Sequence, residues 1–300
     1  MGRATILSQA SDYLSLTKPP IVLLLLITAL GGVFLAAEGS PPLVATLLLL
    51  VGGAAAAGGA SAINHYLDRD IDELMVRTRR RVLPSRRVSP GAALTFGVVL
   101  NIFAFGLLAT WVNLLTASLT LGGTLFYVLV YTSWLKRTTA QNIVIGGAAG
   151  AVPPMAGWAA VTGGLELPAL YLFALVFFWT PPHFWALALL IRQDYARAGI
   201  PMLPVVAGLE STRHNIILYT VTVVTISILF FTTQAVGMVY IGSALVLGVV
   251  FLLLAWHLRA SDRACPGRPQ VQGAKALYLY SLAYVALLFA AVMVDSVVRI

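Results

Sequence analysis

Asn64, Asp68 and Asp72 follow the apolar run 43–63 at intervals of four residues. If the helix of that run continues through them, their side chains stack on one face, about 6 Å apart per step. Carboxylate and amide oxygens are ligands for hard cations such as Mg²⁺. Asp70 falls on roughly the opposite face of the same helix, so the four-residue spacing excludes it from the set.

Arginines follow these acidic residues closely. Their guanidinium groups can bind phosphate oxygens through paired hydrogen bonds. Carboxylates that suit a hard cation, next to guanidinium groups that suit phosphate, indicate a Mg²⁺–diphosphate site. The alternative is a solvated membrane loop of mixed charge. The arginines are Arg77, Arg79, Arg80, Arg81, Arg86 and Arg87.

A second segment with chemistry-bearing residues begins at Pro181 and Pro182, inside a long apolar stretch. The two prolines predict a kink or break of the helix near the middle of the membrane. His183 then lies in the hydrophobic zone, where an ionisable side chain is a functional candidate. The alternative is a histidine hydrogen-bonded to a backbone carbonyl that the prolines have freed. Asp194 and Arg192 follow where this stretch ends.

The composition is that of an integral membrane protein. The chain of 300 residues is 59% hydrophobic and only 10% charged, with a mean hydropathy of +0.91, whereas soluble domains carry about 25% charged residues. Basic cytoplasmic loops and anionic lipid headgroups account for the net charge of +8, so we expect no nucleic-acid partner. The single cysteine, Cys265, excludes a disulfide within one chain.

Nine apolar stretches are long enough to cross a bilayer, and each must be a helix because an isolated strand cannot satisfy its backbone in lipid. We therefore expect an all-α integral membrane protein, with nine transmembrane helices in a single bundle and one domain over residues 1–300. The stretches are 21–37, 43–63, 91–111, 114–134, 142–162, 168–190, 215–233, 236–256 and 276–295.

Lysine and arginine are distributed unevenly between the connections. Nearly all lie before the first stretch or after the even-numbered ones, which predicts that the N-terminus and those loops are cytoplasmic and the C-terminus is outside. Of the 19 basic residues only Arg299 falls on the other side. The stretch 43–63 is rich in glycine and alanine, which predicts close helix contacts and a central place in the bundle.

The motif formed by Asn64, Asp68 and Asp72 resembles the first aspartate motif of the UbiA-type intramembrane prenyltransferases. Within them, the chain is similar to the protohaem IX farnesyltransferases, also called haem O synthases, from about Tyr13 to the last span. The chain departs from the family pattern in two places. Asp194 stands alone where the wider superfamily has two acids four residues apart, and a valine replaces a proline after Arg81. The resemblance rests on DRDID with the following Met-x-Arg-Thr-x-x-Arg, on 131–158, on PPHFWALAL and on 194–206.

This resemblance implies a UbiA-type fold and a Mg²⁺-dependent prenyltransferase. The farnesyl group of farnesyl diphosphate would join a vinyl group of haem b, with addition of water, to give haem O and diphosphate. Asn64, Asp68, Asp72 and Asp194 would be the catalytic and metal-binding residues. The candidate substrate-binding residues are Arg77, Arg81, Lys136, Arg137, Arg192, Tyr195 and His183.

Some of these residues have simpler roles open to them. The alternative for Lys136 and Arg137 is that they simply anchor the loop on the cytoplasmic side. His183 is the most plausible contact to haem, as an axial ligand or a hydrogen-bond donor. His65 points about 100° away from Asn64 on the helix, so it receives no role. Two roles stay open for the aromatic residues around His183. They line a cavity for porphyrin or prenyl chain, or they are part of the ordinary packing between helices.

Two other functions stay open from the sequence. Another prenyltransferase of this type would act on a quinone precursor or a different tetrapyrrole. A secondary transporter also uses broken helices and intramembrane histidines, but its polar residues would lie near the midplane rather than on one rim. The resemblance implies the inner membrane of a bacterial cell with the site facing the cytoplasm. Implied partners are farnesyl diphosphate, haem b, the lipid bilayer and the downstream haem A synthase.

Overall fold

The computed structural model describes residues 2–264 and 273–298, and its regular elements there are all helices. Cys265 and Arg299 lie outside the described residues. Nine helical segments of the described chain are long and apolar enough to cross a membrane. They are α2 (Pro19–Ala36), α3 (Leu43–Leu67), α5 (Pro90–Trp111), α6 (Leu114–Leu125) with η1 (Phe126–Leu135) and α7 (Lys136–Thr138), α8 (Asn142–Thr162), α9 (Leu167–Leu190), α12 (Gly208–Phe230) with η2 (Phe231–Thr233), α13 (Met238–Ala264) and α14 (Ala274–Val298).

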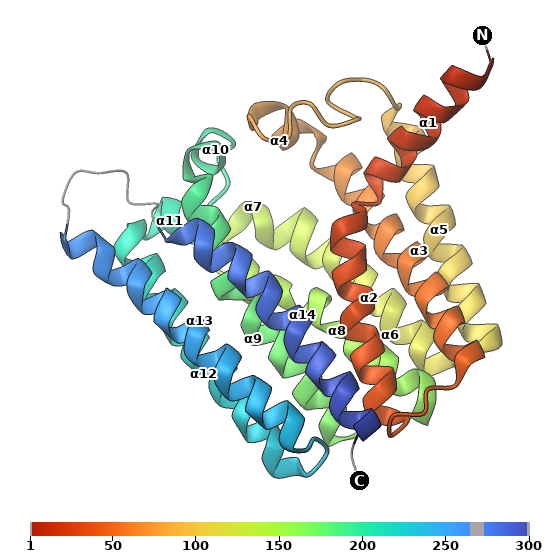
Figure 1. The fold of residues 1–300 in the computed structure, drawn as a ribbon. Helices are drawn as coiled ribbons and strands as arrows, with labels where there is room; N and C mark the ends of the chain where they lie inside the picture. Colours follow the sequence, from red (N-terminus) through yellow and green to blue (C-terminus); the bar gives the residue numbers. More distant parts are fainter. Residues whose placement is uncertain (1, 265–272, 299–300) are drawn as a thin grey trace.

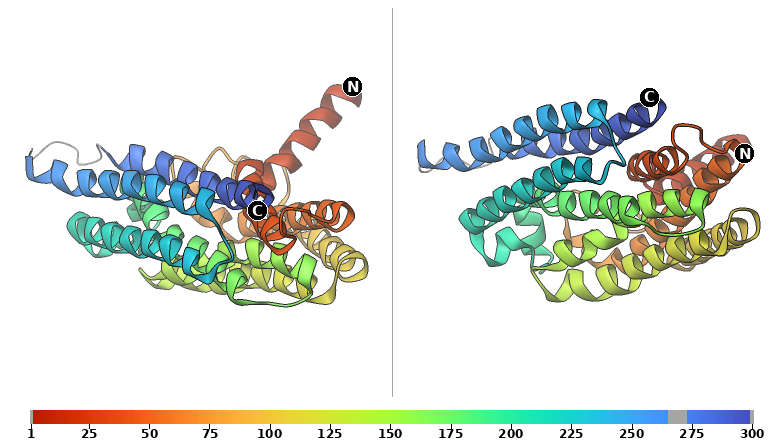
Figure 2. Two further views of the ribbon diagram at one scale, coloured as in Figure 1. Left: turned by 60° about the horizontal axis from the view of Figure 1, so that its bottom comes forward. Right: turned by 90° about the horizontal axis from the view of Figure 1, so that it is seen from below.

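The remaining short helices gather at one end of this bundle, at the top of Figure 1. They connect or precede spanning helices on the side where the basic loops lie. Figure 2 shows the long helices packed side by side, with the first helix projecting from the rim. The short helices are α1 (Gly2–Leu16), α4 (Arg69–Leu74), α10 (Arg192–Arg197) and α11 (Leu203–Val206).

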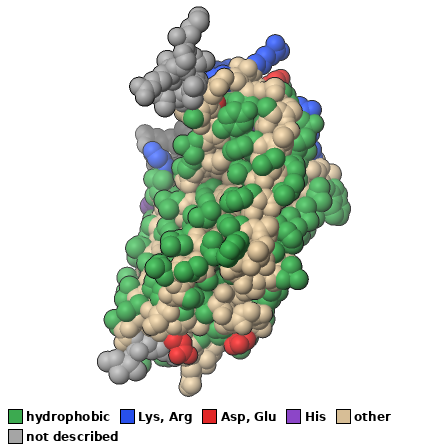
Figure 3. Space-filling view, turned by 90° about the vertical axis from the view of Figure 1, so that its right-hand side faces the viewer, with side chains coloured by type: hydrophobic (Ala, Val, Ile, Leu, Met, Phe, Trp, Pro, Cys, Tyr) green, Lys and Arg blue, Asp and Glu red, His purple; other side chains and the backbone are tan. Residues whose placement is uncertain are grey.

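One flank of the molecule displays the pattern expected of a lipid-facing surface. Hydrophobic side chains cover the height of this flank, and basic side chains gather toward its upper end (Figure 3). The short inter-helix connections at the opposite end contain the exposed acids Glu38 and Glu166. This separation of basic from acidic residues agrees with the predicted topology, in which the basic rim is cytoplasmic.

The glycines of α3 bring it against α5, as the small residues in this stretch predict. A Cβ atom on Gly59 would lie 2.7 Å from the carbonyl oxygen of Gly97, and a Cβ atom on Gly97 would lie 2.7 Å from the carbonyl oxygen of Gly59. The two backbones therefore touch, which only glycine permits. The predicted central place of this stretch is wrong, however. The spans with the largest buried share are α8 and α9, each with half or more of its apolar window buried.

Of the kink or break expected at Pro181 and Pro182, the break is absent, because α9 continues through both prolines to Leu190. A proline removes the hydrogen bond to the carbonyl four residues earlier, which for Pro181 is that of Phe177. This carbonyl packs close to Gly147 of α8, whose Cβ position lies 3.4 Å from it. Close packing between neighbouring helices accommodates a proline inside a membrane helix without interrupting it.

The fourth span contains a feature that hydropathy could not show. Its last part, Phe126–Leu135, is a π-helix of 10 residues. The backbone N–H of Lys136 is bonded to the carbonyl of Tyr131, five residues back. π-Helical segments are rare and frequently lie at functional sites. This one ends at the rim that carries α4 and α10.

Several element ends differ from the predicted ones. The seventh span begins at Gly208 rather than 215, because polar residues around Glu210 continue the helix above its apolar part. The second span extends to Leu67. The helix α1 was not predicted, since this part of the sequence is polar and has no transmembrane pattern. These extensions lengthen the rim where the acidic and basic motifs lie.

Candidate active site

Asn64, Asp68 and Asp72 lie on one face, as the four-residue spacing predicts. The helix α3 ends at Leu67 and α4 begins at Arg69, but the backbone hardly departs from a helix between them. The amide of Asp68 bonds to the carbonyl of Asn64 at 2.9 Å, and that of Asp72 to the carbonyl of Asp68 at 2.8 Å. The Asn64 Nδ2 also donates to Asp68 Oδ2 at 2.7 Å. We call these three residues the acidic row.

The acidic row is buried, and basic side chains neutralise it. Asp68 and Asp72 are 1% and 2% exposed. Lys136 Nζ donates to Asp68 Oδ2 at 2.5 Å. Arg81 Nη1 donates to both carboxylate oxygens of Asp72, at 3.0 and 2.9 Å. Each carboxylate therefore already has a cationic partner in the protein alone.

The π-helix positions two of the side chains that meet the acidic row. Thr132 lies in the π-helix and Lys136 directly follows it, and both side chains contact the acidic row. Thr132 Oγ1 accepts a hydrogen bond of 3.2 Å from Asn64 Nδ2. Lys136 reaches Asp68, as described above. The local widening therefore fixes both the amide and the carboxylate of the row.

Lys18 completes this cluster, although the sequence suggested only a topology-setting charge for it. Its Nζ donates to Asn64 Oδ1 at 2.8 Å. Burial, together with the nearby charges of Arg81 and Lys136, lowers the pKa of Lys18 to about 7. Lys18 directly precedes Pro19, at the N-terminus of α2, with a left-handed backbone (φ 51). The one signal in the sequence was a lysine immediately before a proline pair at the start of a span.

Asp194 is held against the first acidic loop by the loop's backbone. It is 8% exposed, and its Oδ2 accepts a hydrogen bond of 3.2 Å from the backbone N–H of Arg77. Arg197 lies 3.5 Å from its other oxygen. The neighbouring Tyr195 packs in a cluster with Ile71 of α4, and burial raises its pKa to about 12. The two acid-bearing loops, far apart in sequence, therefore pack on one another.

The other predicted substrate-binding arginines lie further out. The side chains of Arg77 and Arg192 are exposed. Arg137 donates to both carboxylate oxygens of Asp70 at 2.8 Å and lies 3.9 Å from Asp68. The hydrogen bond from Arg137 lowers the pKa of Asp70 to about 2. Arg81 and Lys136 are thus the predicted cations that hydrogen-bond to the acidic row, and Arg137 makes a longer ion pair with Asp68.

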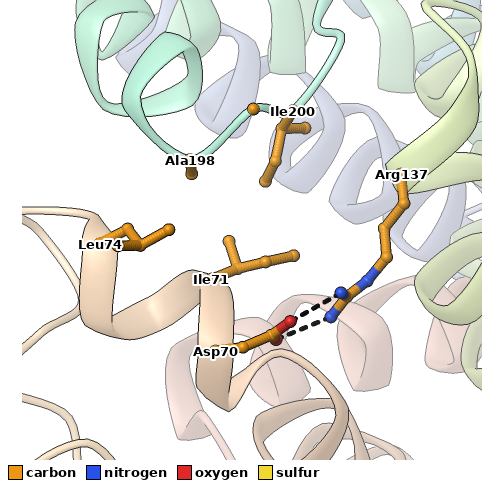
Figure 4. A pocket seen from close by; sticks show the side chains of 7 residues that line it. Asp70, Ile71, Leu74, Arg137, Ala198 and Ile200 are labelled. Carbon is orange, nitrogen blue, oxygen red and sulfur yellow. Dashed lines mark hydrogen bonds and ion pairs between the residues drawn. The ribbon is translucent and has the colours of Figure 1, made fainter.

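A pocket of about 210 Å³ opens beside this outer ion pair. Figure 4 shows the paired Asp70 and Arg137 on one side of it, with Ile71 and Leu74 of α4 facing Ala198 and Ile200 of the second loop. Asp70 points away from the acidic row, as predicted. The pocket therefore lies outside the row, between the two loops.

The acidic row fits a divalent cation that arrives with phosphate. Among the described residues, no group of three or more histidine, cysteine or acidic side chains is arranged to hold a metal by itself. Mg²⁺, however, needs only one or two carboxylates when phosphate oxygens and water supply the other ligands. Asp68 and Asp72 meet that requirement, and Asp68 Oδ1 is buried without a hydrogen bond.

Two more polar residues of α3 extend the site into the bundle. His65 is 3% exposed, and neither of its ring nitrogens has a hydrogen-bond partner. The Oγ atom of Ser61, one turn deeper, is also buried without a partner. Buried polar atoms of this kind are rare. Ser61 and His65 are one turn apart on α3, so these unpartnered atoms lie on one face of that helix, beside the acidic row.

His183 lies on α9 and faces α14. Its Nδ1 is 2.7 Å from Ser281 Oγ. Its ring is stacked between those of Trp179 and Tyr278. The neighbouring aromatic residues predicted to line a cavity or to pack are engaged with other rings, as Phe177 is with Phe173 and Phe178.

Comparison with known proteins relates this arrangement to a family. Residues 25–271 match the family described as the UbiA prenyltransferase family. A "Protoheme IX farnesyltransferase" of Roseiflexus castenholzii is 49% identical over 291 residues, which are 97% of this chain and 53% of that protein. A protein of the same name from Picosynechococcus sp. is 51% identical over 240 residues, 79% of this chain and 73% of that protein. The chain thus spans about half the length of the first of these relatives.

Solved structures share the fold at low sequence identity. A structure described as digeranylgeranylglyceryl phosphate synthase aligns with a TM-score of 0.78 at 17% identity, over 97% of this chain and 99% of that one. A UbiA homologue from Archaeoglobus fulgidus bound to DMAPP and Mg²⁺ aligns with a TM-score of 0.67 at 17% identity, over 96% and 100% of the two chains. The family match over most of the chain and the shared fold lead to one conclusion: this chain belongs to the UbiA prenyltransferase family.

Proposed function

We propose that the protein transfers the farnesyl group of farnesyl diphosphate to a vinyl group of haem b, with addition of water, giving haem O and diphosphate. The observation that carries this proposal is the buried acidic row with its three cations, Lys18, Arg81 and Lys136. The relatives at about 50% identity that are named protoheme IX farnesyltransferases support the choice of substrates.

The acidic row and Asp194 are the proposed residues for Mg²⁺. When bound, Mg²⁺ neutralises charge on a diphosphate and so makes it a better leaving group. Asp68 and Asp72 would hold the ion, with Asn64 as a neutral ligand. The A. fulgidus structure with DMAPP and Mg²⁺ supports this assignment by fold.

The three cations have a second task in this proposal. In the protein alone Lys136 and Arg81 bind carboxylates, and Lys18 binds Asn64. When diphosphate arrives, they would bind its oxygens and stabilise the negative charge that develops as the allylic bond breaks. Arg77, Arg137 and Arg192 are proposed as outer contacts that attract the diphosphate to the rim. The apolar bundle would hold the farnesyl chain and keep water from the allylic cation.

The proposed setting is the inner membrane of a bacterial cell, with this rim in the cytoplasm. The separation of basic from acidic connections supports it. His183 is the proposed contact to haem b, and Tyr195 a contact at the edge of the diphosphate site. The downstream haem A synthase, which would take haem O as its substrate, stays a predicted partner.

The test is incubation of the purified protein with haem b, farnesyl diphosphate and Mg²⁺, followed by mass analysis of the haem. We expect a hydroxyethylfarnesyl product and one diphosphate released per haem modified. The matched control is the Asp68→Asn variant, which keeps the side-chain size and removes the charge. Product formed with a quinone precursor or another tetrapyrrole, and none with haem b, would overturn the acceptor. Haem flux without covalent product would favour a transporter.

A further inference from the structure

The imidazole of His183 is fixed at the contact of α9 with α14. Its ring centroid lies 4.5 Å from that of Trp179, at an interplanar angle of 17°. On the other side it lies 4.9 Å from the ring of Tyr278, at 24°. Both faces of the imidazole are therefore covered by aromatic rings, which leaves only its edge for other contacts.

Hydrogen bonds on α14 determine which ring nitrogen carries the hydrogen. The Ser281 hydroxyl donates to the carbonyl of Tyr278 at 2.7 Å. A hydroxyl has a single hydrogen, so while Ser281 donates to Tyr278 its Oγ accepts from His183 Nδ1, which is 2.7 Å away. The hydrogen of the neutral imidazole therefore resides on Nδ1, and Nε2 carries an available lone pair.

The contact with Ser281 is made by Nδ1, and the Tyr278 backbone also interacts with the imidazole. The Nε2 atom of His183 is not among the buried polar atoms without a partner. The His183 side chain is correspondingly half-buried rather than sealed, on a helix most of whose neighbouring residues are buried. A fixed, neutral imidazole with an accessible Nε2 is the usual form of a histidine ligand to iron.

We propose that Ser281 is a positioning residue for haem: it holds His183 in the Nδ1–H tautomer and so presents Nε2 to the iron of the haem b substrate. The proposal rests on the proposed function for the identity of that substrate. Histidine ligands regularly donate their second ring N–H to a protein group that fixes tautomer and ring orientation. Here the relay runs from His183 through the Ser281 hydroxyl to the Tyr278 carbonyl.

The experiment is a titration of the purified protein with haem b, without prenyl diphosphate or Mg²⁺, followed by absorbance. We expect Ser281→Ala to weaken haem binding by about tenfold or more and to shift the Soret band. The Ser281→Thr variant keeps the hydroxyl and should restore both toward wild type. In His183→Ala the axial signature should disappear and return when free imidazole is added.

Ser296→Ala is the matched control. Ser296 is also a buried serine of α14 that donates to a carbonyl of its own helix, but it lies about 22 Å further along that helix than Ser281. It should leave haem affinity and the Soret band unchanged. An equal shift in Ser296→Ala would attribute the effect to helix packing and overturn the proposal.

Wild-type affinity and an unchanged Soret band in Ser281→Ala would also overturn it, whatever His183→Ala shows. That result is separable from failure of the proposed function. If the wild-type protein still forms haem O in the mass assay, only the placement of haem at His183 is wrong. If it binds no haem and forms no haem product, the proposed function and this inference fail together.

Discussion

Asp68 and Asp72 combine burial with opposite charge in a way that makes them sensitive to small changes. Asp68 lies between Lys136 and Asn64, and Asp72 is bound by Arg81. Removing one partner of a buried ion pair strands the other charge, at a cost of about 3–5 kcal/mol. A test of chemistry should therefore use substitutions that keep size and hydrogen bonding.

The first prediction is that Asp68→Asn or Asp72→Asn lowers turnover at least about 100-fold. The reason is that the amide can no longer neutralise a cation bound to diphosphate. Asp70→Asn is the control, since Asp70 is exposed and points away from the row. It should stay within a few-fold of wild type. Full activity in either row variant, measured as haem O formed, would remove the assignment of the row to Mg²⁺–diphosphate.

Lys18 gives the second prediction. Its ammonium group is buried against Asn64 and beside two other cations. An incoming diphosphate would bring negative charge close to this ammonium group. Hydrogen bonds to charged groups contribute about 1.5–3 kcal/mol, so Lys18→Gln should weaken pyrophosphate binding by about tenfold or more. Calorimetric titration with inorganic pyrophosphate and Mg²⁺ measures this directly.

Lys275, an exposed residue at the start of α14, gives a suitable control for Lys18, because its substitution by glutamine removes the same charge from the same rim. Lys275→Gln should leave pyrophosphate affinity unchanged. Equal losses in both variants would mean that the rim attracts diphosphate only by its overall charge, with no specific contact from Lys18.

At this scale the sequence revealed the acids more readily than their partners. A four-residue spacing on a helix places side chains together with no knowledge of tertiary structure, so the acidic row was predictable. The sequence did not distinguish the roles of Lys18 and Arg137 in the same way. Every lysine or arginine near a cytoplasmic interface satisfies the topology rule, and only packing reveals that one is buried against Asn64 and the other is bound by Asp70.

Between the helices α2 and α8 the backbones approach so closely that glycine is required. A Cβ atom on Gly157 would lie 2.0 Å from the carbonyl oxygen of Ala29. No rotamer change can relieve that overlap, because both atoms belong to or are attached directly to the backbone. Lys18 directly precedes the first residue of α2. Displacement of this helix would therefore also move Lys18 away from Asn64.

The third prediction is that Gly157→Ala destabilises the bundle by about 1–3 kcal/mol, the usual cost of overpacking. Gly150 lies on the same helix with nothing within 4 Å of its Cβ position. Gly150→Ala should therefore be neutral or slightly stabilising, since alanine is the better helix former. The unfolding midpoint in one detergent is the measurement. A midpoint for Gly157→Ala equal to that of Gly150→Ala would show that α2 and α8 do not touch as described.

The elements themselves were predictable to different degrees. Hydropathy located all nine spans, because lipid requires a long apolar helix for each crossing. It did not reveal the π-helix at 126–135 or the continuity of α9 through Pro181 and Pro182. Both depend on where single backbone carbonyls find their contacts, such as that of Phe177 beside Gly147. A hydropathy window averages over such local contacts.

Taken as a whole, the molecule concentrates its ionisable groups at one rim. Lys18, the acidic row and both acid-bearing loops lie at the end marked by α4 and α10 in Figure 1. The opposite end has short connections with exposed acids. A transporter needs sites that open to both sides, whereas an enzyme that takes a charged soluble substrate needs one polar mouth and an apolar interior.

The last prediction follows from that asymmetry. Farnesyl diphosphate carries its charge on a group that does not cross lipid unaided, so only vesicles with the basic rim outward should use the substrate from the medium. Inside-out vesicles should therefore form haem O from added farnesyl diphosphate, and right-side-out vesicles should do so only after permeabilisation. Collapsing the ion gradient should change neither rate. Equal activity in intact vesicles of both orientations would contradict a site confined to the cytoplasmic rim, and loss of activity with the gradient would point to transport.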